Sequence, residues 1–596
     1  MILRKIAPIV ALAFTITAAA VAAEPFTYKK EMLPMLVQEI PRILDDQDTA
    51  TGHFGKGVFV VQDQHPIYPL AAAWSINDPA NPYYHNDRVL NAIMAGGDAL
   101  IKAQDIKGMW TFRKKDNSTW GQIYMPWTYS RWIRAYSLVR EGMPADRRAK
   151  WDKALLLGFT GIEHEAIKEI QNIPAHDAMA LYLAGKVFNK PVWSTTATSF
   201  LHKVAAAQFP GGYWTENVGP VVGYNFVYVD ALGTYYGFSH DPEILPCLAK
   251  AAEFHANFTY PDGTAIETID ERQVYHEGVS GQGLGFSFTP VGRGYLKRQL
   301  ELLKKSPGAE VLASLLLYGD EGEAQDPPAL GDRHYVSPDN LSVVHGENGW
   351  CVCLSAYHAP VPTSRWIQDR QNLVSLFHPA TGLIVGGGNT KLQPGWSTFT
   401  VGDTKLLFHK KGDEDPQFIP PAGLRHTPTD GSLTSGALGL NLSYDANRTS
   451  VKVELPTSNT ARLTYSLDSA PTATVEAHVP LLPHMGVAWK TASGKSGVLT
   501  TDSIHMTAEQ AGAWFQHSNW RVSLPAGSKL DWPILPHNQY RKDGRAESAE
   551  GKIVITLPLK QQGDSKTVDV MIDDSASSAP AKQHQAKPKP RNANKG

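Results

Sequence analysis

Residues 211–228 read GGYWTENVGPVVGYNFVY, a stretch in which glycines, rings and polar groups alternate closely. It holds four glycines, one proline, four Tyr or Trp rings, one carboxylate and two carboxamides. It has too many glycines for a helix interior and too many rings for a flexible linker. Rings and hydrogen-bonding groups on a glycine frame are typical of a binding loop, although a tight turn followed by a helix with packed tyrosines fits the same residues. A binding loop is expected if other segments supply partners for it.

The composition indicates a globular, nearly neutral protein with many aromatic rings. The 596 residues include 56 basic and 58 acidic side chains, giving a net charge of −2. This balance favours neither nucleic acid nor an anionic membrane as a partner. The 15 Trp and 22 Tyr side chains suit stacking on sugar rings, although large helical cores also use them. Only three cysteines are present, Cys247, Cys351 and Cys353, and this odd count gives no disulfide framework. Cys351 and Cys353 are expected to be small buried residues.

The two ends of the chain differ from its body. Arg4 and Lys5 precede an apolar run over 6–21, and small residues follow it, so residues 1–23 are predicted to be a secretory signal peptide. The protein is therefore expected to be periplasmic or secreted, with no stable membrane span in the mature chain. Residues 575–596 are mostly Ser, Ala, Pro, Lys and Gln, a composition that predicts a disordered tail.

Hydrophobic spacing divides the body into a helical part and a strand-rich part. Residues 24–325 contain runs with helical periodicity separated by long loops, which predicts an incomplete (α/α) toroid of helical hairpins. Residues 331–574 contain short β-rich runs separated by turn residues, which predicts an antiparallel β-sandwich. The expected helices cover 32–40, 87–101, 127–138, 147–159, 178–188, 194–207, 226–236, 244–256 and 292–303, and the clearest expected strands cover 341–345, 350–356, 382–385, 397–401, 450–455, 461–467 and 552–557.

Four segments of the helical part carry groups suited to sugar chemistry. An aromatic segment contains Trp120, Tyr124 and Trp127, and its alternative is core packing. A second segment, predicted to be a loop over 171–177, contains Asn172 and His176 before a helix that Asp177 would cap. The third segment is 211–228, and the fourth contains Arg272 and His276. These segments show no metal-binding spacing, phosphate loop or dinucleotide fingerprint, so we expect no cofactor and no metal in the site. A structural zinc or calcium ion in the strand-rich part is left open.

His, Tyr, Asn and Arg around a sugar are the groups that β-elimination of a uronic acid polymer needs. The C5 proton is weakly acidic, so the uronate carboxylate must be neutralised as charge develops next to it. A base then removes this proton while an acid protonates the leaving O4. The expected partner is therefore a polysaccharide, and the oligomeric state is left open.

Residues 213–220 and 223–228 resemble the tyrosine-bearing loop of heparinase II/III-like and related alginate lyases. The segment with Asn172 and His176 is similar in position to the Asn-His element of that family, although here three residues separate the two. The change from helices to strands resembles the family's architecture across nearly the whole mature chain. His345-Gly346, residues 365–370 and residues 386–389 resemble features of its sandwich.

The resemblance implies a set of roles. Tyr224 would be the base, the acid or both, with Tyr228 as its rival, and His176 would neutralise the carboxylate or act as base. Glu216 would orient a neighbour or share the neutralisation while protonated. The implied substrate contacts are Asn172, Asn225, Arg272, His276, Trp120, Tyr124, Trp127, Trp214 and His345.

Two other functions fit the same residues. An α/α-barrel glycoside hydrolase would need two carboxylates flanking the bond, and Glu216 with Asp177 or with Glu267 would supply them. A non-catalytic polysaccharide-binding protein would use the aromatic side chains alone.

Overall fold

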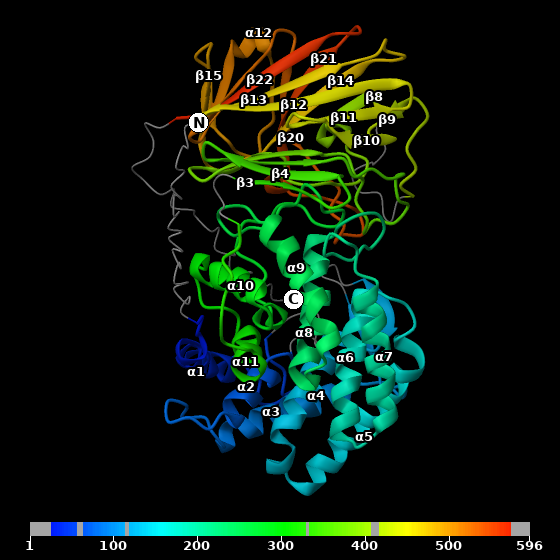
Figure 1. The fold of residues 1–596 in the computed structure, drawn as a ribbon, viewed down its shortest axis with the longest axis vertical. Helices are drawn as coiled ribbons and strands as arrows, with labels where there is room; N and C mark the ends of the chain where they lie inside the picture. Colours follow the sequence, from blue (N-terminus) through cyan, green and yellow to red (C-terminus); the bar gives the residue numbers. More distant parts are fainter. Residues whose placement is uncertain (1–24, 56–63, 114–117, 329–332, 407–416, 574–596) are drawn as a thin grey trace, which may run out of the picture.

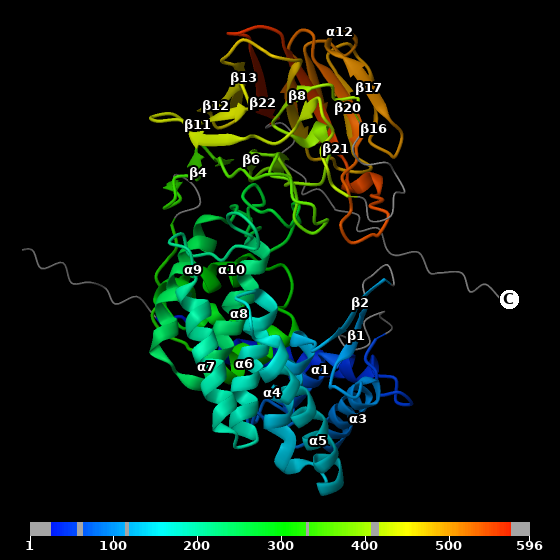
Figure 2. The same ribbon diagram turned by 90° about the vertical axis from the view of Figure 1, so that its right-hand side faces the viewer.

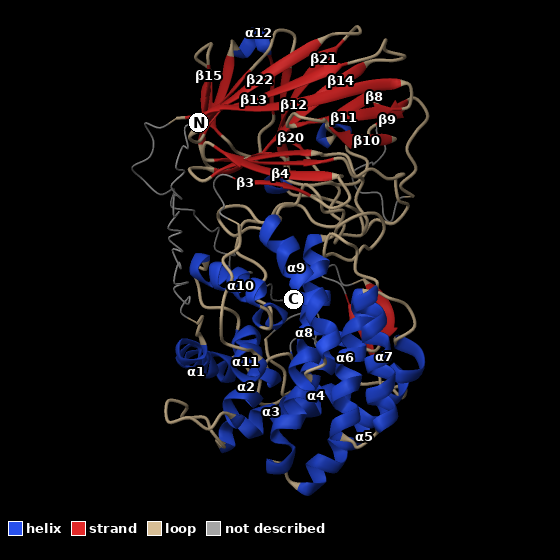
Figure 3. Cartoon of the chain, viewed as in Figure 1, coloured by secondary structure: helices blue, strands red, loops and turns tan. Residues whose placement is uncertain are grey.

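The computed structural model describes residues 25–55, 64–113, 118–328, 333–406 and 417–573. A helical domain lies against one face of a β-sandwich (Figure 1), and Figure 3 separates the two by secondary structure. The last helix of the helical domain ends at Tyr318, and the first strand of the sandwich begins at Arg333. The predicted signal peptide, residues 1–23, and the predicted tail, residues 575–596, both lie outside the described residues.

The helical domain is a toroid with an inner and an outer layer of helices. α2, α4, α6 and α8 pack side by side in that order, and α11 packs against both α8 and α2. α1 packs on α11, α3 on α2, α7 on α6 and α9 on α8, which forms the outer layer. The helices are α1 (Lys29–Asp45), α2 (Ile67–Ser75), α3 (Asp87–Ala103), α4 (Pro126–Val139), α5 (Ala145–Gly161), α6 (Asn172–Val187), α7 (Pro191–Ala206), α8 (Val222–Ser239), α9 (Leu245–Asn257), α10 (Pro290–Leu302) and α11 (Ala309–Tyr318).

Each helix expected from the hydrophobic periodicity is present in the structure. Two further helices of the toroid, α2 and α11, were not predicted. In α2, every residue from Ile67 to Trp74 is buried, so the sequence shows no polar face and no period. α11 is the apolar run AEVLASLLLY, which has the same difficulty. Both helices lie in the inner layer, which explains their uniform hydrophobicity.

α6 begins earlier than predicted, so the second segment, residues 171–177, is mostly helix and not a loop. The expected loop over 171–177 is wrong, because the helix starts at Asn172 and contains Pro174 in its first turn. Proline is tolerated there because its missing N–H would have no helical partner. Asn172 and His176 therefore lie one helical turn apart on the same face. Asp177 is inside the helix and does not cap it.

A β-hairpin replaces part of the loop that was expected between α3 and α4. β1 (Trp110–Arg113) pairs antiparallel with β2 (Thr119–Ile123). Buried Trp110 anchors it by donating its indole N–H to Leu100 O at 3.0 Å. In Figure 2 the hairpin stands beside the toroid and points toward the sandwich.

The sandwich consists of two antiparallel sheets with a shared apolar core, as predicted. One sheet has the order β17-β20-β21-β14-β7-β6-β5-β4-β3, and beside it β8 pairs with β14 and β9 pairs with β8. The other sheet has the order β10-β11-β12-β13-β22-β19-β18-β15-β16. The strands are β3 (Arg333–Val336), β4 (Ser342–Glu347), β5 (Trp350–Ser355), β6 (Val374–His378), β7 (Gly382–Val385), β8 (Phe399–Gly402), β9 (Leu424–Arg425), β10 (Asp430–Leu433), β11 (Gly439–Tyr444), β12 (Asn447–Thr457), β13 (Thr460–Leu467), β14 (Val475–Leu481), β15 (Ala488–Thr491), β16 (Ser496–Val498), β17 (Ile504–Thr507), β18 (Trp514–His517), β19 (Trp520–Ser523), β20 (Lys529–Ile534), β21 (Lys552–Leu559) and β22 (Ser565–Ile572), with a short helix α12 (Ala508–Ala511).

A separate apolar cluster joins the two domains. From the helical domain it includes Tyr213, Val222, Phe254, Phe258, Tyr260, Ile266 and Ile269, and from β4, β5, β6 and β7 it includes Val344, Cys351, Cys353, Phe377 and Leu383. The three cysteines are buried and free, and the burial of Cys351 and Cys353 confirms the prediction. Because members of 211–228 and 259–275 belong to this cluster, the sheet fixes both segments in place.

Candidate active site

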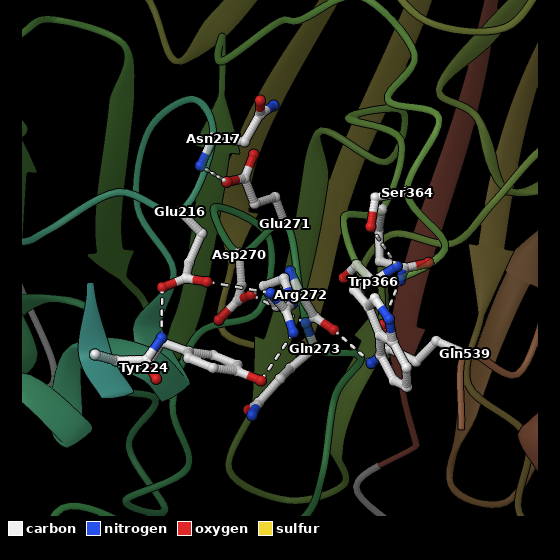
Figure 4. Close-up of polar contacts among 12 residues, drawn as sticks. Glu216, Asn217, Tyr224, Asp270, Glu271, Arg272, Gln273, Ser364, Trp366 and Gln539 are labelled. Atoms are coloured by element: carbon white, nitrogen blue, oxygen red, sulfur yellow. Dashed lines mark hydrogen bonds and ion pairs between the residues drawn. The ribbon is translucent and has the colours of Figure 1, made fainter. Parts of the chain in front are cut away.

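Four polar side chains from three separate segments meet at the domain interface (Figure 4). Arg272 Nη2 donates to Tyr224 Oη at 2.8 Å, and its Nη1 donates to Glu216 Oε2 at 3.2 Å. Asn172 Nδ2 donates to the other oxygen, Glu216 Oε1, at 2.7 Å. We refer to Asn172, Glu216, Tyr224 and Arg272 as the tyrosine cluster. Asn172 starts α6 and Tyr224 lies in the first turn of α8, so two helix N-termini open onto this cluster.

Arg272 is held from several directions. Its backbone N–H donates to Asp270 Oδ1 at 2.6 Å, and its carbonyl accepts from Gln539 Nε2 at 2.8 Å. The guanidinium carbon lies 4.4 Å from the centre of the Tyr224 ring. The arginine is only 9% exposed, so its charge acts on its neighbours with little solvent screening.

Burial and charge oppose each other at Tyr224 and Glu216. Burial raises the pKa of the Tyr224 phenol above its ordinary value, and the Arg272 guanidinium counteracts this. Burial also raises the pKa of Glu216, and Asn172 and Arg272 counteract it. Since Arg272 donates to the phenolic oxygen, the proton of Tyr224 must point in another direction. The phenol proton is therefore free to be donated to a group other than Arg272.

One buried ion pair, between Arg370 and Glu271, and the hydrogen bonds around it fix the loop that precedes Tyr224. Glu271 Oε1 accepts from the backbone N–H of Asn217 at 2.8 Å and of Val218 at 3.3 Å. Arg370, from the sandwich, donates to the carbonyls of Val218 and Pro220 and lies 3.5 Å from Glu271. Asp270 Oδ2 accepts from Gly223 N at 3.2 Å, which secures the start of α8. The sandwich thus positions the tyrosine cluster without contributing a side chain to it.

His176 does not join the tyrosine cluster in this structure. It is 1% exposed, its Nε2 lies 3.1 Å from Val227 O and 3.7 Å from Asp230, and its ring is edge-on to Trp127. Burial lowers its pKa to about 4, so the imidazole is neutral at pH 7. This burial does not favour a charged imidazole that neutralises a substrate carboxylate, and the alternative role of His176 as a base stays a prediction. The reason for the burial is the helical start at Asn172, which places His176 one turn deeper in the toroid.

Three other predicted residues are part of the core. Tyr228 is 1% exposed and stacks on Trp214 with ring centres 4.9 Å apart. Trp214 donates its indole N–H to Val204 O at 2.7 Å. Asn225 is fully buried, accepts from Trp214 N at 3.2 Å and lies 2.9 Å from His255. Their burial does not favour direct substrate contact, and their contacts with one another hold the loop.

The remaining predicted contacts are spread over the surface and interior. Trp120 on β2 is 49% exposed, whereas Tyr124 is buried and Trp127 packs partly buried against the toroid core. His276 is exposed four residues beyond Arg272. His345 on β4 lies 3.3 Å from Glu347 and 3.2 Å from His334, which are not members of the tyrosine cluster. Of the three rings of the predicted aromatic segment, Trp120 is therefore the most exposed.

The carboxylate pairs of the hydrolase alternative are unfavourable. Asp177 is 1% exposed, and Glu267 is 4% exposed with its oxygens accepting from Gly387 N and Tyr260 Oη. A hydrolase needs both carboxyl groups to reach the glycosidic oxygen or the attacking water. Neither partner proposed for Glu216 meets this requirement.

Several residues that build the site were missed as functional positions. No role was predicted from the sequence for Asp270, Glu271, Arg370 or Gln539. Their contacts join positions 47 to 267 residues apart in sequence, which no local pattern reveals. A usable signal was the density of charges in Asp270-Glu271-Arg272, which is unusual in a segment that is otherwise apolar enough to be buried.

The described residues contain neither a metal-binding cluster nor a membrane-spanning helix. Within these ranges, no group of three or more His, Cys, Asp or Glu side chains is arranged to hold a metal ion. Within the same ranges, no helix combines the length and apolarity required to cross a bilayer.

Comparison with known proteins gives similarity of structure and not of sequence. No protein-family model matches the chain, and no curated protein matches it either. Heparinase III is similar over 86% of this chain and 77% of its own, with a TM-score of 0.50 and 13% identity. A Paenibacillus xanthan lyase is similar over 93% of this chain, with a TM-score of 0.52 and 11% identity, and this chain spans 58% of that lyase. The chain therefore has the fold of these polysaccharide lyases, a helical toroid followed by an antiparallel β-sandwich.

Proposed function

We propose that this protein is a polysaccharide lyase that cleaves a uronic-acid-containing polysaccharide by β-elimination. The observation that carries the proposal is the contact of one buried guanidinium with both a phenol and a carboxylate, Arg272 with Tyr224 and Glu216. The shared fold with heparinase III and xanthan lyase supports the same class of reaction. The predicted signal peptide supports a periplasmic or secreted location for it.

Arg272 and Asn172 are the groups proposed to neutralise the uronate carboxylate. One is a buried cation and the other is an amide donor, and both already bind the Glu216 carboxylate. A substrate carboxylate presents the same kind of acceptor to the same donors. The N-termini of α6 and α8 add a favourable partial positive charge. Glu216 is a positioning residue in this proposal, because it holds the two donors in register.

Tyr224 is proposed to serve as base and then as acid. In its phenolate form, which the Arg272 hydrogen bond stabilises, it takes the proton from C5. The C5–H electron pair forms the C4=C5 double bond while the C4–O4 bond breaks. The same proton then passes from the phenol to O4, which leaves a new hydroxyl, an unsaturated uronate and the regenerated phenolate. Protons and electrons balance without a further reactant.

The polymer is proposed to be weakly charged, such as alginate or a glucuronate-containing exopolysaccharide. Densely sulfated substrates call for many Lys and Arg side chains, and the net charge of −2 offers no such excess.

The proposal is tested by incubating the full-length mature protein with polymannuronate, polygalacturonate and a glucuronate-containing exopolysaccharide. We expect ultraviolet absorbance of a 4,5-unsaturated uronate to rise with one of them, together with new reducing ends. Reducing ends without that absorbance would show hydrolysis instead. Binding without either signal would show a non-catalytic polysaccharide-binding protein.

The proposed role of Tyr224 predicts activity that increases toward alkaline pH. The pKa of the phenol is above its ordinary value, so the reactive phenolate is a small fraction at neutral pH and grows about tenfold per pH unit. Arg272→Gln should lower kcat by about 100-fold at pH 7, because the variant loses the cation that stabilises the phenolate. The measurement is kcat/KM from pH 5 to 10 for both proteins. A decline from pH 7 to 10 in the parent would show that Tyr224 acts only as an acid.

A further inference from the structure

Three aromatic side chains connect the two domains beside the tyrosine cluster. Trp120, on β2 of the hairpin, contacts Trp366 of the sandwich edge-on, with ring centres 5.6 Å apart. Trp366 contacts Tyr540, from the segment between β20 and β21, with ring centres 5.9 Å apart. Trp120 is 49% exposed and Tyr540 is 47% exposed. We refer to Trp120, Trp366 and Tyr540 as the aromatic bridge.

The aromatic bridge is continuous with the tyrosine cluster. Tyr540 directly follows Gln539, whose side-chain amide donates to the carbonyl of Arg272. Gln368 Nε2 in turn donates to Gln539 Oε1, so the segments carrying Trp366 and Tyr540 are tied together behind Arg272. The phenol of Tyr540 is also close enough to contribute to the raised pKa of Tyr224. Figure 4 shows Trp366 and Gln539 side by side, next to Arg272.

Two of the three rings, Trp120 and Trp366, are held in place by further neighbours. Trp120 packs against Phe112 of β1 at 5.2 Å, and Arg365 lies 4.7 Å from the centre of the Trp366 ring. Large exposed aromatic surfaces are uncommon on a protein unless they bind something. Fixed rings with apolar faces and polar edges are suited to the apolar faces of pyranose rings, since little conformational entropy is lost on binding.

We propose that the aromatic bridge is a sugar-binding subsite for a pyranose unit next to the one at Tyr224. Trp120 and Tyr540 provide the stacking faces, and Trp366 sets their spacing. This inference rests on the proposed function, because the occupant is another unit of the same polysaccharide. The subsite is assembled from both domains, so it also explains why the hairpin is oriented toward the sandwich.

The test separates binding from chemistry. Binding of polymannuronate, polygalacturonate and a glucuronate-containing exopolysaccharide is measured by affinity electrophoresis, with dextran as a polymer lacking uronate. Trp120→Ala and Tyr540→Ala should each weaken binding to the retained polymer by about tenfold or more. Tyr540→Phe keeps the ring and should stay within about twofold of the parent. Tyr84→Ala, at a side chain 38% exposed and stacked on His85 in the helical domain, is the matched control.

Each outcome bears on one of the two proposals. Unchanged binding in Trp120→Ala and Tyr540→Ala, or a lowered melting temperature without a change in binding, would show that the bridge only joins the domains. An equal loss in Tyr540→Phe would assign the effect to the hydroxyl and overturn stacking. If the parent binds a uronate polymer through these rings but releases no unsaturated product, the subsite stands and the lyase proposal fails. Where elimination is observed, Trp120→Ala should raise KM by about tenfold with a smaller change in kcat.

Discussion

Tyr224→Phe is expected to lower kcat for elimination by about 10³- to 10⁴-fold while leaving the fold unchanged. The substitution removes the group that is proposed both to take the C5 proton and to deliver it to O4. The ring remains, so the packing under the Arg272 guanidinium, 4.4 Å from the ring centre, is kept. The hydroxyl accepts from Arg272, whose second contact with Glu216 persists in the variant. The measurement is the initial rate of unsaturated uronate formation, with circular dichroism as the check on folding.

Tyr228→Phe is the matched control for this prediction. Tyr228 lies one turn later on α8, is 1% exposed and stacks on Trp214, so its hydroxyl is not placed to reach a polymer. We expect its activity to stay within about fivefold of the parent. The reverse result, with Tyr228→Phe inactive and Tyr224→Phe active, would transfer the catalytic role to Tyr228.

Arg370→Ala is expected to destabilise the protein by about 3–5 kcal/mol, the range for removing one partner of a buried ion pair. Arg370 and Glu271 are both about 1% exposed at their side chains, and the arginine also donates to the carbonyls of Val218, Pro220 and Ile269. The variant leaves an uncompensated carboxylate and three carbonyls with fewer donors. The melting temperature should fall by about 10 °C, and activity should fall too because Val218 and Pro220 precede Tyr224.

The protonation of Glu271 gives this prediction a distinctive pH dependence. Burial raises the pKa of Glu271 to about 7, and Arg370 counteracts this. Without Arg370 the pKa rises further, so the folded state binds a proton that the unfolded state releases. Stability of the variant is therefore lost as pH increases from the unfolded pKa near 4.5 through the folded pKa, and the deficit should be smaller at pH 5 than at pH 8.

Two further variants complete the test of Arg370. Glu271→Gln in the Arg370→Ala background should recover part of the lost stability, because it removes the unpaired charge. Arg462→Ala breaks an exposed ion pair with Asp569 on the sandwich and should leave the melting temperature unchanged within error. Equal losses for Arg370→Ala and Arg462→Ala would show that the buried contact does not hold the loop.

Local periodicity was sufficient to locate most of the architecture. The amphipathic runs predicted α3 and α4, and the β-rich runs predicted β12 and β13, because burial of one face imposes a period on each of these elements. The same reasoning failed for α2, which is buried on all sides and so has no period. It also failed for the β1–β2 hairpin, whose short strands are mostly exposed.

The sequence predicted which types of residue the candidate site contains, but it identified only some of the residues that lie there. Asn172, Glu216, Tyr224 and Arg272 were selected from the sequence. The structure joins them by three hydrogen bonds, from Asn172 to Glu216 and from Arg272 to both Glu216 and Tyr224. His176 was selected from the same segment as Asn172, but the helix that contains both turns it into the core. Asn172 lies at the N-terminal end of α6, beside the tyrosine cluster, whereas His176 lies one turn further along α6 and packs against α8. Where α6 begins therefore decides which of the two side chains reaches the cluster.

The sequence by itself determined the order of the two domains, most of their helices and several of their strands, and the chemical types of the candidate site. These properties follow from burial patterns within single segments, which are local. Only the tertiary structure brought Glu271 and Arg370 to the loop before Tyr224, and Trp120, Trp366 and Tyr540 to one another. Such contacts arise when the sandwich packs on the toroid, and their energy depends on burial and distance that no single segment encodes.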